Sequence, residues 1–304
     1  MKFWLALCAA IWLVPAARGF AGEAIRWPRP VEISQGGLGE VRVGGANLID
    51  VSGRLGTTPI VFYPAGAGIF AALLGADIEA KPGASKLLLT ATDRAGVEHE
   101  RVIPFKVKSR AFRKESFNVP ANFDQMSEES LAEIRREQSA FARAFEYSTP
   151  ERLWEAPFIR PVPQEASASS FGLRRIINGT PRAPHSGTDL SAPAGTEVLA
   201  ANDGRVALVG NFFFAGGSIV IDHGGGLFTM YFHLSEFKVD EGVMVQKGDV
   251  IALSGATGRV TGPHLHWGAR LGNARVDPLE LLTKITTAAE SPDALRPVVK
   301  AKGK

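Results

Sequence analysis

The stretch Gly262-Pro263-His264-Leu265-His266-Trp267 decides how the C-terminal half of this 304-residue chain is interpreted. Successive side chains of a β-strand alternate between its two faces, so His264 and His266 point the same way. Two imidazoles directed at one place can share a metal ion, or one can bind the ion while the other transfers protons. The stretch therefore predicts a strand that carries chemistry, and its spacing leaves both divisions of labour open.

Three residues upstream can complete a site around this pair, namely His185, Asp189 and His233. Pro184 and Gly187 argue against a helix between His185 and Asp189, so a turn or bulge must bring these two side chains together. Joined to the His-x-His pair, they give a candidate site of two imidazoles and one carboxylate. Three protein ligands and a water is the pattern of a catalytic zinc, whereas structural zinc sites close with four ligands and favour cysteine. We therefore expect Zn²⁺ as the cofactor.

Other metal-binding and nucleophile motifs fit the sequence less well. A cupin also has His-x-His, but Ala269 and Arg270 stand where its glutamate is expected. A non-haem iron oxygenase usually has His-x-Asp, and here three residues separate the upstream histidine from its aspartate. The chain has neither the His-Glu-x-x-His signature of helical zinc sites nor a Gly-x-Ser-x-Gly elbow.

Composition is that of an ordinary globular protein, with 45% hydrophobic and 21% charged residues. The length allows about two domains of roughly 100–200 residues each. The net charge of +3 gives weak support to an anionic partner such as a cell wall. It makes no case for nucleic acid, so we expect no nucleic-acid partner.

Residues 1–21 have the pattern of a signal peptide, which predicts a periplasmic or secreted protein. An apolar run from Phe3 to Val14 follows a positive start, and Gly19-Phe20-Ala21 offers small residues for cleavage. The run is shorter than a membrane span of about 20 residues, so we expect no membrane span after cleavage. Cys8, the single cysteine, lies in this segment. The mature chain therefore has no thiol, and a metal must be bound through nitrogen and oxygen.

The pattern downstream predicts a mainly β protein of two domains. Residues 22–110 contain short strand candidates separated by glycine-rich turns, which is typical of a small β-sandwich. These candidates are residues 31–33, 41–43, 59–63, 86–92 and 102–107. Residues 165–285 again show short strands and tight turns, which predicts a second, antiparallel β domain. Residues 286–304 are poor in apolar side chains, so we expect a flexible tail.

A helical and proline-rich linker is expected over residues 111–164. Between residues 124 and 146, Leu131, Ile134, Phe141 and Phe145 fall on one helical stripe. Ser127 is a fair N-cap for this helix. Prolines follow it at positions 157, 161 and 163 and favour an extended passage into the second domain.

Four ordered segments of the second domain resemble the M23 peptidases, the lysostaphin and LytM-type zinc endopeptidases of bacterial cell walls. The resemblance covers roughly residues 170–280. The matching segments are Phe171-Gly172-Leu173-Arg174, His185-Ser186-Gly187-Thr188-Asp189, Tyr231-Phe232-His233-Leu234-Ser235 and the residues from Gly258 to Trp267.

The resemblance implies a role for each candidate residue. His185, Asp189 and His266 match the zinc ligands of the family, and His264 and His233 match its two non-ligand histidines, which act on the attacking water and the transition state. The resemblance also implies an antiparallel LytM-type sheet and hydrolysis by metal-activated water. It leaves open which of the two non-ligand histidines is the principal base.

We therefore expect an exported zinc metalloendopeptidase that hydrolyses peptide cross-links of bacterial peptidoglycan. One alternative is a non-enzymatic activator of cell-wall amidases, and another is a protease of glycine-rich proteins. The intact five-residue set argues against the first alternative. The two remaining histidines, His99 and His223, are expected in an exposed strand and in a turn, outside the site.

Overall fold

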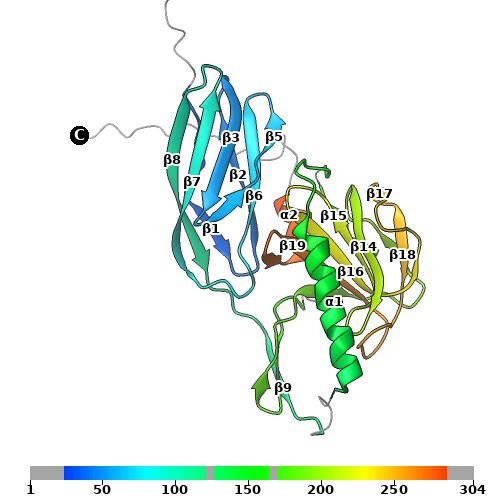
Figure 1. Cartoon of the computed structure of the whole chain (residues 1–304). Coiled ribbons are helices and arrows are strands. Elements are labelled where there is room, and N and C mark those ends of the chain that lie inside the picture. The colour runs from blue at the N-terminus through cyan, green and yellow to red at the C-terminus, as the bar shows by residue number, and fades with distance from the viewer. Residues whose placement is uncertain (1–23, 121–125, 156, 164–169, 286–304) are drawn as a thin grey trace, which may run out of the picture.

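The computed structural model describes residues 24–120, 126–155, 157–163 and 170–285. The expected signal peptide and the expected C-terminal tail lie outside these ranges. Figure 1 shows a β-sandwich beside a second β domain, with one long helix lying across the latter. This architecture confirms the predicted mainly β fold. No helix in the described ranges is both long and apolar enough to cross a membrane.

The sandwich is built from eight strands in two sheets. One sheet has the order β1-β8-β7-β3-β4 and the other the order β2-β6-β5. The strands are β1 (Val31–Ser34), β2 (Leu38–Gly44), β3 (Leu48–Leu55), β4 (Thr58–Ile60), β5 (Tyr63–Gly66), β6 (Ile69–Gly75), β7 (Gly83–Asp93) and β8 (Glu98–Lys108). Buried side chains from both sheets, such as Val43, Leu74, Leu89 and Phe105, form the core between them.

Two strands and one break in the sandwich were not predicted. β3 and β6 were not among the expected strands, and the single strand expected over residues 59–63 is two strands in different sheets. β4 ends at Ile60, and β5 begins at Tyr63 after the chain has crossed to the other sheet. The alternation of residue types does not reveal such a crossing, because both halves are apolar.

The second domain is centred on a nine-stranded antiparallel sheet with the main order β12-β19-β16-β15-β14-β17. Beside this path, β13 pairs with β18, β18 also pairs with β16, and β20 pairs with β19. A 3₁₀ turn, η1 (Pro278–Glu280), and a short helix, α2 (Leu281–Lys284), follow the sheet. The strands are β12 (Gly187–Leu190), β13 (Glu197–Leu199), β14 (Gly204–Phe212), β15 (Gly216–Asp222), β16 (Leu227–Phe237), β17 (Met244–Val245), β18 (Val250–Ser254), β19 (Leu265–Leu271) and β20 (Ala274–Val276).

The two faces of this sheet are covered differently. Tyr231 and Trp267 lie in the main core on one face and are fully buried. On the other face, Phe228 and Met230 pack with side chains of α1 (Glu128–Glu146), which Figure 1 shows lying across the sheet. The predicted N-cap is present, since the Oγ of Ser127 accepts a hydrogen bond from the Ser130 amide at 3.1 Å. The predicted helix is confirmed.

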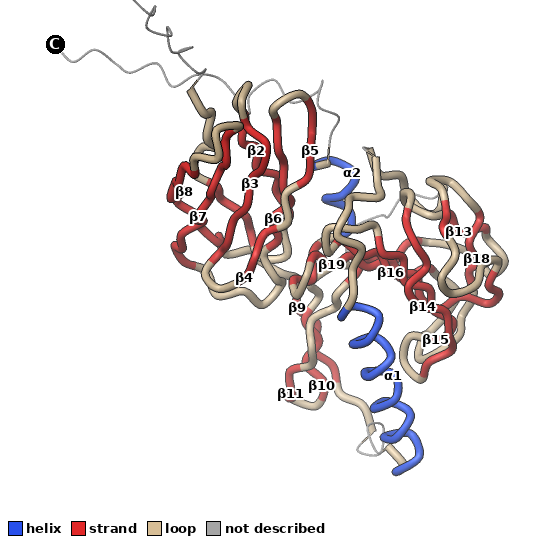
Figure 2. Tube along the Cα trace, turned by 45° about the horizontal axis from the view of Figure 1, so that its top comes forward, coloured by secondary structure: helices blue, strands red, loops and turns tan. Residues whose placement is uncertain are grey.

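A small three-stranded sheet connects the expected linker to the second domain. It consists of β9 (Lys114–Phe117), β10 (Arg174–Ile177) and β11 (Thr180–Pro181). β9 pairs in parallel with β10, and β10 pairs antiparallel with β11. Figure 2 shows this sheet on the side of the second domain that also carries α1. Residues 114–117 of the expected linker are therefore part of a sheet.

The sandwich packs against the second domain through ionic and apolar contacts. The carboxylate of Asp77 accepts two hydrogen bonds from the Arg275 guanidinium, at 2.9 and 2.7 Å. Arg110 pairs with Asp277 at 2.9 Å. Leu73 of the sandwich belongs to the same buried cluster as the core of the second domain. Arg275 lies opposite Arg270, near the end of β19, whereas His266 lies at the start of that strand.

Candidate active site

Three predicted ligands meet where β12 lies against β19. Asp189 and His266 are directly opposite each other in the antiparallel pair, and His185 precedes β12 by two residues. The Nδ1 atom of His266 lies 2.9 Å from Nε2 of His185 and 3.0 Å from Oδ1 of Asp189. The three ligand atoms lie within 4.8 Å of one another. The turn or bulge that the sequence required is the passage from His185 into β12.

The segment before β10 holds His185 and Asp189 in place. The Nδ1–H of His185 donates to the Ser170 carbonyl at 3.0 Å, because a carbonyl can only accept. Nε2 is therefore the unprotonated nitrogen that faces the other ligands. The Ser170 hydroxyl accepts the Asp189 amide at 2.8 Å. Sequence reasoning missed Ser170, and its position directly before the Phe171-Gly172 segment was the available signal.

Gly187 is required by the close approach of the two strands. A Cβ atom at this position would overlap Nε2 of His266 and would lie 2.6 Å from the Trp267 carbonyl oxygen. Any larger residue would push β12 away from β19 and separate Asp189 from His266. The glycine between the two upstream ligands is thus part of the site's geometry.

His264 and His233 lie beside the three ligands with their rings 4.8 Å apart, measured between centroids. His264 donates from Nδ1 to the Gly262 carbonyl at 2.9 Å, and its Nε2 lies 3.7 Å from Oδ1 of Asp189. His233 donates from Nδ1 to the Thr257 carbonyl at 2.9 Å. Both rings therefore present an unprotonated Nε2, which can accept a proton. Thr257 was not predicted, because it acts through its backbone.

A β-bulge directs His233 into the site. Ser218 of β15 faces both Phe232 and His233, since the register shifts between the pairs Gly217–Leu234 and Ile219–Tyr231. His233 has a φ of 66°, a left-handed conformation that costs a non-glycine residue on the order of 1–3 kcal/mol. Regular alternation from Tyr231 would turn this imidazole toward the core. The bulge turns it instead toward His264.

Burial and hydrogen bonding set the charge of the site. Burial works against ionisation of Asp189, but the adjacent imidazoles of His185 and His266 outweigh it and hold the pKa of the carboxyl well below its usual range. Burial lowers the pKa of His233 to about 4 and also lowers the pKa of His266. These shifts favour a carboxylate at Asp189 and neutral imidazoles at His233 and His266, and ionised carboxylates and neutral imidazoles are the forms that bind a divalent metal.

The donor set fits zinc. It offers two imidazole nitrogens and one carboxylate oxygen on converging side chains, and the second nitrogen of His185 is fixed by a backbone carbonyl. Trp267 points to the opposite face and is fully buried, as expected for a core residue.

The other two histidines lie elsewhere. His99 lies in β8 and pairs with Asp93 at 3.0 Å. His223 follows β15 directly and is fully buried, where it bonds to the Asp203 carbonyl and to Thr229, each at 2.7 Å. As expected, it lies outside the site and at the turn between β15 and β16, where its amide donates to the Leu227 carbonyl at 2.8 Å; its side chain is in addition buried in the core.

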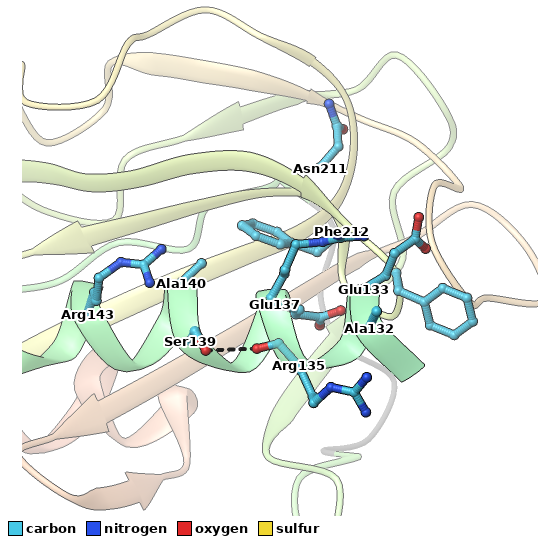
Figure 3. Close-up of a pocket in the computed structure, with 11 residues that line it drawn as sticks. Ala132, Glu133, Arg135, Glu137, Ser139, Ala140, Arg143, Asn211 and Phe212 are labelled. Atoms are coloured by element: carbon cyan, nitrogen blue, oxygen red, sulfur yellow. Dashed lines mark hydrogen bonds between the residues drawn. The ribbon is translucent and has the colours of Figure 1, made fainter. Parts of the chain in front are cut away.

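A surface cavity lies away from these histidines. It has a volume of about 970 Å³. Figure 3 shows its lining residues between α1 and the end of β14. Arg135, Arg143, Asn211 and Phe212 are among its lining residues, and none of the five candidate site residues lines it.

Comparison with known proteins assigns the chain to a family. The profile of Peptidase family M23 matches residues 183–278, which contain all five candidate site residues. A crystal structure of a Pseudomonas aeruginosa protein assigned to peptidase M23 is 30% identical, covers 84% of this chain and 96% of that chain, and superposes with a TM-score of 0.63. The chain belongs to the M23 peptidase family. This membership confirms the resemblance seen in the sequence and the predicted metallopeptidase class.

Curated relatives match this M23 peptidase over part of their length. Peptidoglycan DD-endopeptidase ShyA of Vibrio cholerae is 48% identical over 101 residues, which are 33% of this chain and 24% of that protein. DD-carboxypeptidase/endopeptidase Mpg of Neisseria meningitidis is 41% identical over 124 residues, which are 40% of this chain and 28% of that protein. The match thus spans about a quarter of the length of these relatives.

Proposed function

We propose that the chain is an exported zinc metalloendopeptidase that hydrolyses peptide cross-links of bacterial peptidoglycan, with residues 165–285 as its peptidase domain. The observation that carries this proposal is the convergence of His185, Asp189 and His266 on one point, with the imidazoles of His264 and His233 beside them. The names of the relatives ShyA and Mpg support peptidoglycan as the substrate class. The signal-peptide pattern of residues 1–21 supports an extracytoplasmic location, periplasmic or secreted.

In this proposal, His185 Nε2, Asp189 Oδ1 and His266 Nδ1 hold the zinc. When bound, the ion supplies Lewis-acid polarisation of the scissile carbonyl and lowers the pKa of its water toward about 7. Asp189 is ionised and partly offsets the charge of the ion, while the carbonyl of Ser170 keeps the imidazole of His185 in the tautomer that binds through Nε2.

In this proposal, His264 and His233 transfer protons and stabilise the developing charge. Nε2 of His264 is unprotonated and lies on the ligand side of its ring, so it can take the proton of the attacking water, an effect typically worth about 10²–10⁴-fold in rate. Nε2 of His233 is also unprotonated, because Nδ1–H is committed to Thr257. His233 can therefore donate a hydrogen bond to a developing oxyanion only after it has gained a proton at Nε2. Transfer of the proton that His264 has taken from the water to the leaving amine would complete the reaction.

The direct test is digestion of purified peptidoglycan by the full-length protein, with and without a chelator, followed by mass spectrometry of the products. We expect new amino and carboxyl ends within the peptide cross-links, lost with chelator and restored by Zn²⁺. Intact cross-links, together with stimulation of an added cell-wall amidase, would identify the non-enzymatic activator instead. Cleavage of a glycine-rich protein but not of the cross-links would identify the third alternative.

A further inference from the structure

Helix α1 contacts residues that adjoin the candidate active site, although it precedes the family-matched segment. The ring of Phe141 lies 5.4 Å from the ring of Phe232, centroid to centroid. Phe232 in turn stacks on the imidazole of His266, with centroids 5.3 Å apart and planes 4° from parallel. Phe232 and His266 are directly opposite each other on β16 and β19. A proposed zinc ligand is thus held on one side by a ring that α1 supports from behind.

A second contact from α1 reaches the backbone near His233. An oxygen of Glu137 accepts the Phe214 amide at 3.0 Å, in the turn between β14 and β15. The next residue, Ala215, accepts the His233 amide at 2.9 Å through its carbonyl. The Phe214 carbonyl accepts the Arg259 amide at 3.1 Å, which joins the same turn to the loop before His264. Figure 3 shows Glu137 on the side of α1 that faces β14.

The burial of Glu137 is unusual for a residue on a surface helix. Only 9% of it is exposed, and glutamate is seldom buried without a partner. Within the described residues its carboxylate forms no ion pair, and it accepts a hydrogen bond from the Phe214 amide. An apolar residue would cover the sheet at lower cost, since a buried carboxylate must give up its hydration. The carboxylate therefore serves the turn at Phe214 rather than the packing of the helix.

We propose that α1 is a positioning element of the active centre. Phe141 fixes the ring plane of His266 through Phe232, and Glu137 fixes the backbone at His233 through the Phe214–Ala215 turn. This inference rests on the proposed function, because it assigns zinc binding to His266 and proton transfer to His233. It goes beyond that function by extending the catalytic framework to a helix outside residues 183–278.

The first test compares Phe141→Leu with Phe145→Leu. Phe145 is one helical turn further along the same helix, and its ring contacts Phe228 at 5.3 Å, away from His266. Both substitutions remove one aromatic ring from the same cluster, so their thermal midpoints should fall by similar amounts. We expect Phe141→Leu to weaken Zn²⁺ binding on the order of 10-fold, as is usual for residues that support a ligand. Phe145→Leu should leave Zn²⁺ binding within about 2-fold of wild type.

Zinc affinity is measured by competition with a chromophoric chelator on the full-length protein, so the result does not depend on catalysis. Equal Zn²⁺ affinities for the two variants would overturn the role of Phe141. If Phe141→Leu does not fold, Phe141→Met has a similar volume but a longer and more flexible side chain, and it is compared in the same way.

The second test compares Glu137→Ala with Glu137→Gln, and uses the exposed Glu133→Ala as a control. We expect Glu137→Ala to lower kcat on the order of 10-fold with KM and Zn²⁺ content unchanged, and to speed amide hydrogen exchange at His233. Glu137→Gln should restore both values, because its side-chain carbonyl can still accept the Phe214 amide. Unchanged amide hydrogen exchange at His233 and unchanged kcat in Glu137→Ala would refute the positioning role of Glu137.

The two proposals can fail separately. A wild-type protein without endopeptidase activity would refute the proposed function. The Zn²⁺ affinities and the hydrogen exchange at His233 would still show whether α1 positions these residues.

Discussion

The buried imidazole of His223 predicts a loss of stability in mild acid that one substitution should remove. His223 is fully buried, and burial lowers its pKa from 6.5 to about 4, although hydrogen bonding to the Asp203 carbonyl and the charges of Asp222 and Asp203 act in the opposite direction. Its ring also lies against Phe158, with centroids 5.2 Å apart. In the unfolded chain the imidazole titrates near its ordinary pKa of about 6.5.

The direction of the pH effect on stability follows from the number of protons that the folded and unfolded states bind. Between pH 6.5 and pH 4 the unfolded chain binds more protons at this residue than the folded protein does, so the free energy of unfolding falls as the pH falls. A pKa difference of about 2.5 units destabilises the fold, relative to high pH, by about 2 kcal/mol at pH 5 and about 3 kcal/mol at pH 4. Above about pH 7 the contribution of His223 is negligible, since both states are neutral.

The assay is urea unfolding of wild type and His223→Gln at pH 7, 6, 5 and 4.5, followed by tryptophan fluorescence. His223→Gln is less stable at pH 7, because it loses packing and a hydrogen bond. The stability difference between the two proteins should shrink by about 2 kcal/mol from pH 7 to pH 5. Acid-sensitive groups common to both proteins, such as His233 and Asp189, cancel in that difference. A constant difference across this range, or an NMR titration of His223 near pH 6.5, would refute the reasoning.

Three further outcomes are expected. His266→Ala should lose stoichiometric Zn²⁺ in elemental analysis, whereas His264→Ala should retain Zn²⁺ and lose most activity; equal Zn²⁺ loss would show that their roles are reversed. Ser170→Ala should weaken Zn²⁺ binding roughly 10-fold in a chelator competition, since the Asp189 amide loses its acceptor, and unchanged affinity would contradict this. Asp77→Ala should lower unfolding stability by about 1–2 kcal/mol with Zn²⁺ affinity unchanged, because a partly exposed two-bond ion pair between the domains is lost.

The parts of the fold that follow local rules could be predicted from the sequence. The helix was predictable because Ser127 caps it and its apolar residues recur every three or four positions. β6 was not predictable from alternation, because Ala71 and Leu73 face the second domain while Ala72 and Leu74 face the sandwich core. A strand buried on both faces has no polar residue at alternate positions.

In the candidate site, too, some residues could be predicted from local pattern and others could not. The pair His264 and His266 could be read from a strand period of two, and the structure places both imidazoles near Asp189. His233 could be placed only by its resemblance to a family, since the bulge that directs it depends on pairing with a strand distant in sequence. Ser170 was missed because nothing in its own residue type distinguishes it from other serines near it in the sequence.

The Asp77–Arg275 ion pair lies beside the end of β19 that is distant from His266. Strand β19 rises about 3.3 Å per residue, so the four residues from His266 to Arg270, the partner of Arg275, span roughly 13 Å. The ion pair between the sandwich and the second domain lies beside one end of this strand and the histidines lie at the other end, so loss of the ion pair should change the attachment of the sandwich and leave the geometry of the histidines as it is.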